Sequence, residues 1–297
     1  MKYFLTLLAL LLPGVAMAKL NVVTTIPDLA AIAQEIGGDK ITVKSIARGD
    51  EDPHFLEPKP SYILIVNHAD LLIEVGLQLE IGWLPVLITQ SRNPKIQTGM
   101  HGRMDASEKI PLLEIPVGAI DRSQGDVHPD GNPHYWLNPQ NGLVIAQEIA
   151  EHLSQLDPVN KDFYGLQLQT FQTKLKNKIV EWQKLASPLK GKTAVAYHKT
   201  TPYLADWLGL KIVDFIEPKP GIPPSPSHIL ALMDEMTKQK VPWIITASYY
   251  DMKAARELSE KTGAKVLVLP SSVGGNKEVS TYEELFDYLI AQLKGAS

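Results

Sequence analysis

The feature that most constrains the fold of this chain is a repeated alternation of short aliphatic runs with longer segments of helical periodicity. In the first unit, LNVVTTI predicts a strand, and Asp28 then begins the amphipathic segment DLAAIAQEI, which stops at Gly37. Four such units lie in residues 19–156 and four more in residues 189–297. Strands that alternate with helices favour parallel sheets covered by helices on both faces.

The other predicted strands follow the same rule of an apolar run that precedes a helical segment. They are ITVKSIA, DLLIEVG, KIQTG, TAVAYH, KIVDFI, VPWIITA and AKVLVLP. The fourth of the eight, KIQTG at residues 95–99, is separated from its helix by a long loop. Structureless loops of that length in compact domains are usually functional or disordered.

One long helix interrupts the alternation. Between Asp157 and Ala186 no turn signal occurs, and apolar residues recur at mostly three-to-four-residue steps. At 1.5 Å per residue, such a helix is roughly 40 Å long, enough to run along two lobes. We therefore predict an α/β protein with two four-stranded parallel lobes, residues 19–156 and 189–297, joined by a helix over 157–188. A single eight-stranded barrel would also contain eight units, but it does not explain the long helix.

The N-terminus predicts an export signal. MKYFLTLLALLLPGVAMA places a lysine before an apolar run and ends in the small-x-small pattern Ala16-Met17-Ala18. The apolar run is about ten residues, short of the roughly 20 that span a bilayer. We expect residues 1–18 to be removed, so that a soluble, monomeric protein without a membrane anchor begins at Lys19 in a bacterial periplasm.

Composition excludes several classes of function. The formal net charge is -4 with both signs well mixed, so nothing indicates a nucleic-acid partner. The chain has no cysteine, which excludes disulfides, thiolate metal sites, cysteine nucleophiles and lipid attachment to an N-terminal cysteine.

Three of the eight histidines fall where a ligand site is expected. His54 follows the second predicted strand, His134 follows the fourth, and His198 ends the first strand of the second half. Ligands of open α/β sheets bind beyond the carboxyl ends of the strands, so both lobes contribute imidazoles to one cleft. Neutral imidazoles predict a first-row transition metal, with zinc the best match.

The other histidines are interpreted differently. His68, His152 and His228 are explained by exposure in a turn, on a helix and near a helix start. His101 and His128 lie in the long loop before the fourth helix, and their role stays open.

The segments around the three histidines resemble a known family. DPHFLEPKPS, GNPHYWLNP and AVAYHKTTPYLADWLGL are similar to the three ligand motifs of the metal-binding solute receptors of ABC importers, the zinc- and manganese-binding periplasmic proteins and their lipoprotein counterparts. The resemblance extends over essentially the whole mature chain. It implies two α/β lobes, a rigid linking helix, a metal ion held by His54, His134 and His198, and delivery of that ion to a membrane permease.

The sequence departs from the family pattern at two places. Members with a carboxylate-rich manganese site usually have glutamate at the position of His198 and aspartate after the last strand, where this chain has Ser271 in LPSSVGG. That difference favours zinc, and a receptor for manganese or iron is the alternative. Many zinc members also carry a long His-rich loop before the second motif, and here only GAIDRSQGDVHPDG is present. We therefore expect His128 to be a neighbour of the site rather than a ligand.

The sequence leaves alternatives open for the fourth ligand and for the class of function. Water is the simplest fourth ligand, and Glu51, Asp52 and Glu217 are possible carboxylates. Three ligands plus water is also the count of a secreted zinc hydrolase with Glu57 as base, although no HExxH helix is present. A surface adhesin would need an anchor or a repeat. A non-enzymatic zinc receptor that delivers its ion to an ABC permease is the function that the sequence favours.

Overall fold

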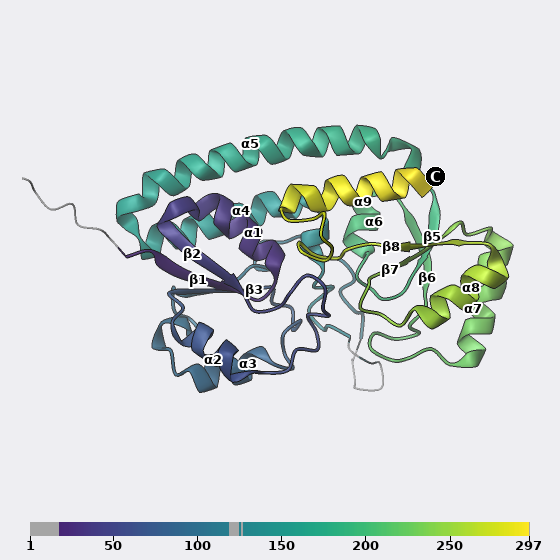
Figure 1. Cartoon of the computed structure of the whole chain (residues 1–297), viewed down its shortest axis with the longest axis horizontal. Helices are drawn as coiled ribbons and strands as arrows, with labels where there is room; N and C mark the ends of the chain where they lie inside the picture. The colour runs from purple at the N-terminus through teal and green to yellow at the C-terminus, as the bar shows by residue number, and fades with distance from the viewer. Residues whose placement is uncertain (1–17, 119–124, 126, 297) are drawn as a thin grey trace, which may run out of the picture.

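The computed structural model describes residues 18–118, 125 and 127–296, and in it two parallel sheets lie side by side (Figure 1). The α5 helix, Lys161–Leu185, runs along both lobes. Nearly all of the predicted export signal, residues 1–17, lies outside the described residues. Within the described ranges, none of the helices combines the length and the apolar character that a membrane span requires.

The first lobe is a four-stranded sheet in the order β2-β1-β3-β4. Its strands are β1 (Leu20–Thr24), β2 (Ile41–Ser45), β3 (Leu71–Glu74) and β4 (Arg103–Asp105). Its helices are α1 (Pro27–Gly37), α2 (Pro60–Asn67), α3 (Leu84–Ser91) and α4 (Pro139–Leu156). Because successive strand residues face opposite sides, Val22 packs with α1 and α4 whereas Val23 packs with α2 and α3.

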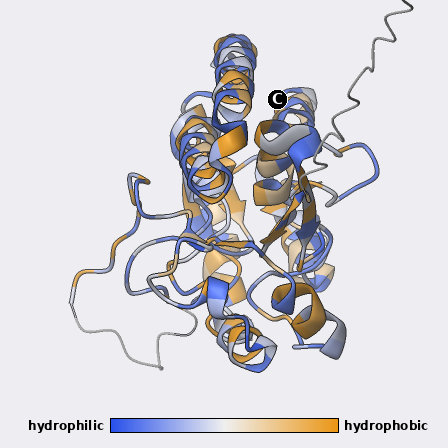
Figure 2. Ribbon diagram, turned by 90° about the vertical axis from the view of Figure 1, so that its left-hand side faces the viewer, coloured by the Kyte–Doolittle hydropathy of each residue, from blue (hydrophilic) through white to orange (hydrophobic). Residues whose placement is uncertain are grey.

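The second lobe repeats this order as β6-β5-β7-β8. Its strands are β5 (Thr193–Ala196), β6 (Lys211–Phe215), β7 (Trp243–Thr246) and β8 (Lys265–Val268). Its helices are α6 (Pro202–Leu208), α7 (Pro226–Gln239), α8 (Met252–Thr262) and α9 (Tyr282–Ala296). The predicted fold class, two four-stranded parallel α/β lobes, is confirmed. Figure 2 shows that the strands are mainly hydrophobic, whereas the helices mix hydrophobic and hydrophilic residues.

The prediction of the fourth strand at residues 95–99 was wrong. Pro94–Ile96 form a 3-10 turn, because Pro94 cannot donate to a sheet and the Asn93 side chain accepts a hydrogen bond from the Lys95 amide. The strand is Arg103–Asp105 instead, and it pairs with Leu72–Glu74.

The long helix is also shorter than the predicted span. Pro158–Asn160 form a 3-10 turn, so α5 begins only at Lys161 and ends at Leu185.

The two lobes share one hydrophobic core. A single buried cluster contains Val22 of the first sheet, Ala194 of the second, and residues of α5 and α9 that lie across them. Trp182 of α5 is fully buried in this cluster, and its Nε1 donates to Asp287 of α9 at 2.7 Å. Separating the lobes would expose part of this core to water, which is unfavourable.

A buried carboxylate also joins the lobes. Asp28, in the first turn of α1, is fully buried and accepts hydrogen bonds from the Ser272 hydroxyl and, at 3.2 Å, from the Val273 amide. The backbones are in close contact here, since a Cβ on Gly49 would lie 2.0 Å from the Val273 carbonyl oxygen. Burial raises the pKa of Asp28 to about 7, although the bond from Ser272 opposes the shift.

The raised pKa of Asp28 predicts a pH-dependent stability. The folded protein retains a proton on Asp28 that the unfolded chain releases above pH 4, so the free energy of unfolding should fall as pH rises from about 4 to 7. Asp28→Asn is neutral throughout and keeps an acceptor and a donor. It should reduce the loss of stability between pH 4 and 8 by on the order of 4 kcal/mol, since the pKa is shifted from 3.8 to about 7 and each pKa unit corresponds to about 1.4 kcal/mol.

Urea unfolding of the metal-free protein at several pH values measures this effect. Asp39→Asn, which changes an exposed carboxylate, is the control and should keep the wild-type dependence. If the free energy of unfolding changed with pH by the same amount in wild type and Asp28→Asn, the role given to Asp28 would be contradicted.

Candidate metal centre

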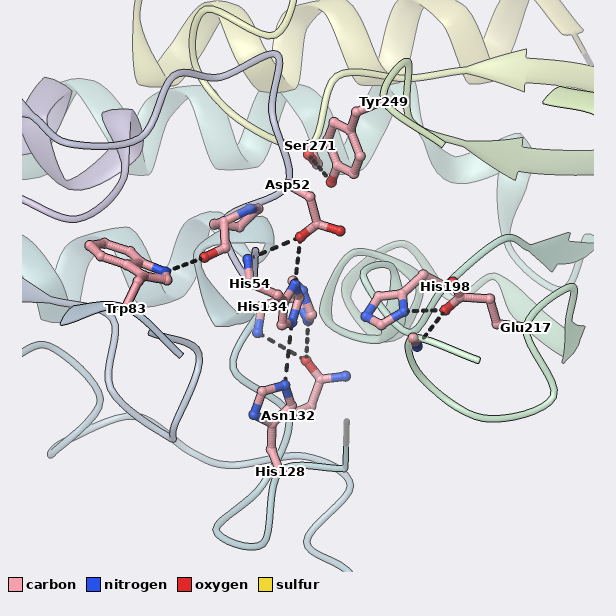
Figure 3. Close-up of polar contacts among 12 residues, drawn as sticks. Asp52, His54, Trp83, His128, Asn132, His134, His198, Glu217, Tyr249 and Ser271 are labelled. Carbon is pink, nitrogen blue, oxygen red and sulfur yellow. Dashed lines mark hydrogen bonds and ion pairs between the residues drawn. The ribbon is translucent and has the colours of Figure 1, made fainter. Parts of the chain in front are cut away.

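The three histidines predicted from the sequence lie together between the lobes (Figure 3). His54 is in the loop from β2 to α2, His134 directly precedes the 3-10 turn Tyr135–Leu137 before α4, and His198 follows β5. Their exposed fractions are 5%, 2% and 6%. One ring nitrogen of each lies within 4.8 Å of those of the other two, a grouping that could hold a metal ion.

Two buried tryptophans fix the backbone around the site. Trp83 Nε1 donates to the Pro53 carbonyl at 2.9 Å, directly before His54 (Figure 3). Trp136 Nε1, two residues after His134, donates to the Ser271 carbonyl of the other lobe at 2.8 Å. The positions of these histidines are therefore set by buried contacts, some of which cross between the lobes.

Each of the three rings is oriented by an oxygen atom at its Nδ1. The pairs are His54 with Asp52 Oδ1 at 2.7 Å, His134 with Asn132 Oδ1 at 3.0 Å, and His198 with Glu217 Oε2 at 2.7 Å. Carboxylate and amide oxygens only accept hydrogen bonds, so each Nδ1 carries the proton and each Nε2 keeps its lone pair. The three Nε2 atoms are thus the ones that could bind a metal ion.

Two of these arrangements come from the same local motif. Asp52-Pro53-His54 and Asn132-Pro133-His134 both read Asx-Pro-His, and in both the Asx oxygen also accepts from the histidine backbone amide, at 3.0 and 2.9 Å. Such Asx turns hold a short loop in one conformation, and proline fixes one of its dihedral angles. Asn132 was not predicted from the sequence, although this repeated tripeptide was the available signal.

Burial and neighbouring rings control the charge of the site. Burial, followed by the positive charge that His54 and His198 would carry, lowers the pKa of His134 well below its ordinary value. Burial alone would raise the pKa of Asp52, but its hydrogen bonds and charge interaction with His54 hold it below the ordinary value. His134 is therefore neutral and Asp52 ionised near neutral pH, the states that suit a ligand and its orienting partner.

The carboxylates considered as a fourth ligand have other partners. Asp52 and Glu217 bond to the Nδ1 atoms of His54 and His198, and Glu51 accepts from the Arg48 amide at 2.8 Å. These carboxylates orient imidazole rings or a loop. Ser271, at the position of the family's aspartate, hydrogen-bonds through its hydroxyl to Tyr249 at 2.9 Å.

His128, which was expected only to lie near the site, contacts one of its rings directly. Its Nε2 lies 3.3 Å from Nε2 of His54, and its Nδ1 lies 2.9 Å from the Leu77 carbonyl oxygen.

Three of the remaining histidines contact the backbone elsewhere in the protein, and His101 is exposed. The contacts are His68 Nδ1 with the Leu64 carbonyl, His152 Nδ1 with the His101 carbonyl, and His228 Nε2 with the Phe215 carbonyl. The buried group of potential ligands does not include them.

The fold and the buried imidazole cluster define a two-lobed receptor for a small cation. Over residues 22–296 the chain matches the sequence model of the family described as "ZnuA: Zinc-uptake complex component A periplasmic", and it belongs to that family, the metal-binding receptors of ABC importers. The family consists of solute-binding receptors rather than enzymes.

Relatives that are named for different metals are similar to this chain in sequence. The chain is 30% identical over 254 residues to "Manganese ABC transporter substrate-binding lipoprotein PsaA" of Streptococcus pneumoniae, covering 84% of this chain and 78% of the relative. It is 27% identical over 287 residues to "Iron-binding protein YfeA" of Yersinia pestis, covering 94% and 86%. A solved structure, "Crystal structure of ZnuA", has the same fold, with a TM-score of 0.79 at 24% identity over 94% of this chain and 100% of that chain.

The orienting role of Glu217 can be separated from a ligand role. Glu217→Gln keeps an oxygen that accepts from His198 Nδ1, so it should retain most of the zinc affinity, whereas Glu217→Ala should lose about 10- to 100-fold. Competition titration against a zinc chelator measures both variants, with Glu51→Ala as the control that should match wild type. Equal, large losses for both Glu217 variants would mean that the carboxylate itself binds the metal.

Proposed function

We propose that this protein is a periplasmic zinc receptor that binds one ion through His54, His134 and His198 and delivers it to a membrane ABC permease. The observation that carries the proposal is the convergence of three buried imidazoles whose Nδ1 atoms all bond to oxygen. In this proposal zinc is the transported substrate and not a catalytic cofactor.

The donor atoms favour zinc over manganese, one of the metals in the relatives' names. Imidazole nitrogen suits zinc, whereas manganese is better served by carboxylate oxygen and comes last in the general affinity order. Asp52 and Glu217, the acids beside the rings, bond to Nδ1 atoms and so leave nitrogen as the donor.

The proposal keeps the domain plan predicted from the sequence. Residues 1–18 are a cleaved export signal, 19–156 and 189–297 form the two lobes, and 157–188 connect them. The mature protein is a monomer without a membrane anchor. The shared core and the interlobe hydrogen bonds support a receptor that holds its ion in a fixed cleft.

No observation favours the hydrolase alternative. Glu57, its proposed base, is exposed, whereas the imidazole cluster is buried. A general base must reach the proton that it removes.

Alanine substitution should lower the zinc affinity at the three cleft histidines but not at the other histidines. His54→Ala, His134→Ala and His198→Ala should each lower zinc affinity more than about 100-fold, beyond the range for residues that only orient ligands. His68→Ala, His152→Ala and His228→Ala are the matched controls and should bind as wild type does. Calorimetry on chelator-stripped protein, beside ester and phosphoester turnover assays, tests binding and function together. Turnover by the zinc-loaded protein, or tight binding by the cleft variants, would contradict the proposal.

Metal preference should follow the nitrogen donors. Wild type should bind zinc far more tightly than manganese, and His198→Glu should narrow the zinc-to-manganese affinity ratio because it exchanges a nitrogen donor for a hard oxygen. Parallel competition titrations with both metals measure the ratio, with His228→Glu as control. A ratio that His198→Glu leaves unchanged would show that this position does not face the ion.

A further inference from the structure

We propose that His128 is a fourth ligand, so that the site holds its metal ion through four imidazole nitrogens. This inference rests on the proposed function and adds a residue to its site. It begins from one distance, the 3.3 Å between Nε2 of His128 and Nε2 of His54, which is drawn as a dashed line in Figure 3.

The hydrogen bond at the other ring nitrogen determines what this Nε2 can do. His128 Nδ1 lies 2.9 Å from the Leu77 carbonyl oxygen, which only accepts, so Nδ1 carries the proton. In the neutral ring, Nε2 then presents a lone pair. The Nδ1 of His54 donates to Asp52, so its Nε2 likewise faces the site. The contact between the two Nε2 atoms is a hydrogen bond when one of them carries a proton, and a metal ion that replaced this proton would be bound by both nitrogens.

The distance matches the geometry of a shared metal ion. With Zn–N bonds of about 2.0 to 2.1 Å, two ligands of a tetrahedral site have nitrogens about 3.3 to 3.4 Å apart. The His54–His128 pair already has this spacing. His134 and His198 are held within 4.8 Å of His54, so a small inward movement of these rings would complete the sphere.

The loop between β3 and α3, whose Leu77 carbonyl contacts the His128 ring, has a strained backbone. Leu77 and Gln78 have φ values of 50° and 64°, in the left-handed region that residues other than glycine seldom adopt. Such strain persists only where surrounding contacts impose it, and it is common at ligand sites. Here it accompanies the carbonyl that orients the His128 ring.

The location of His128 gives this ligand a distinct role. It is half-buried, whereas the other three histidines are buried. It lines a cavity of about 430 Å³ together with His134, His198 and Lys199. His128 therefore completes the coordination sphere from the side on which the ion can enter and leave, and its loss should admit water and speed release of the ion.

X-ray absorption spectroscopy at the zinc edge tests the proposal, because it counts imidazoles. Wild-type protein loaded with one equivalent of zinc should show four imidazole nitrogens. His128→Asn, which keeps an N–H donor for the Leu77 carbonyl, should show three imidazoles and one oxygen, and should release zinc to a chelator about tenfold faster or more. His68→Asn is the matched control, because the His68 Nδ1 also lies beside a backbone carbonyl, at 2.8 Å, and it should keep four imidazoles.

The outcomes separate this inference from the proposed function. Three imidazoles in the wild type, unchanged in His128→Asn, would overturn the fourth ligand and leave the zinc receptor intact. A wild-type protein that binds no zinc would overturn both. The wild-type count decides the question even if the variant does not fold.

Discussion

The candidate site depends on one constraint, namely that the Nδ1 proton of each cleft histidine is committed to an oxygen acceptor. Asp52, Asn132, Glu217 and the Leu77 carbonyl supply these oxygens. The consequence is chemical as well as geometric, since a ring whose Nδ1 carries the proton presents its Nε2 lone pair, and His54, His134 and His198 form one group that could hold a metal ion. Ligands oriented in this way bind an ion with little further ordering of the rings.

The rest of the fold keeps this arrangement in place. One core extends through both sheets and is covered by α5 and α9, so rotation of one lobe against the other would disturb apolar packing. Hydrogen bonds that cross the cleft add to this restraint, from Trp136 to Ser271 and from Asn132 to the Lys199 carbonyl. In the proposed receptor, exchange of the ion by local movement at the half-buried His128 would leave this packing intact.

Much of this architecture could be predicted because it is encoded locally. The strand-helix periodicity gave the two lobes, and the placement of His54, His134 and His198 after predicted strands located the cleft. The fourth strand was misplaced because Asn93 caps a turn that the apolar pattern of residues 95–99 does not reveal. The approach of His128 to His54 could not be predicted, since it joins two loops 74 positions apart and depends on the Leu77 carbonyl.

The central claim is that the metal-binding atoms are set before the metal arrives. Long-range proton–nitrogen correlation spectra of metal-free protein with ¹⁵N-labelled histidine, recorded near pH 8, report which ring nitrogen carries the proton. The account predicts the Nδ1–H tautomer for His54, His128, His134 and His198. Protonated Nε2 in these rings, or a mixture of tautomers in rapid exchange, would contradict it.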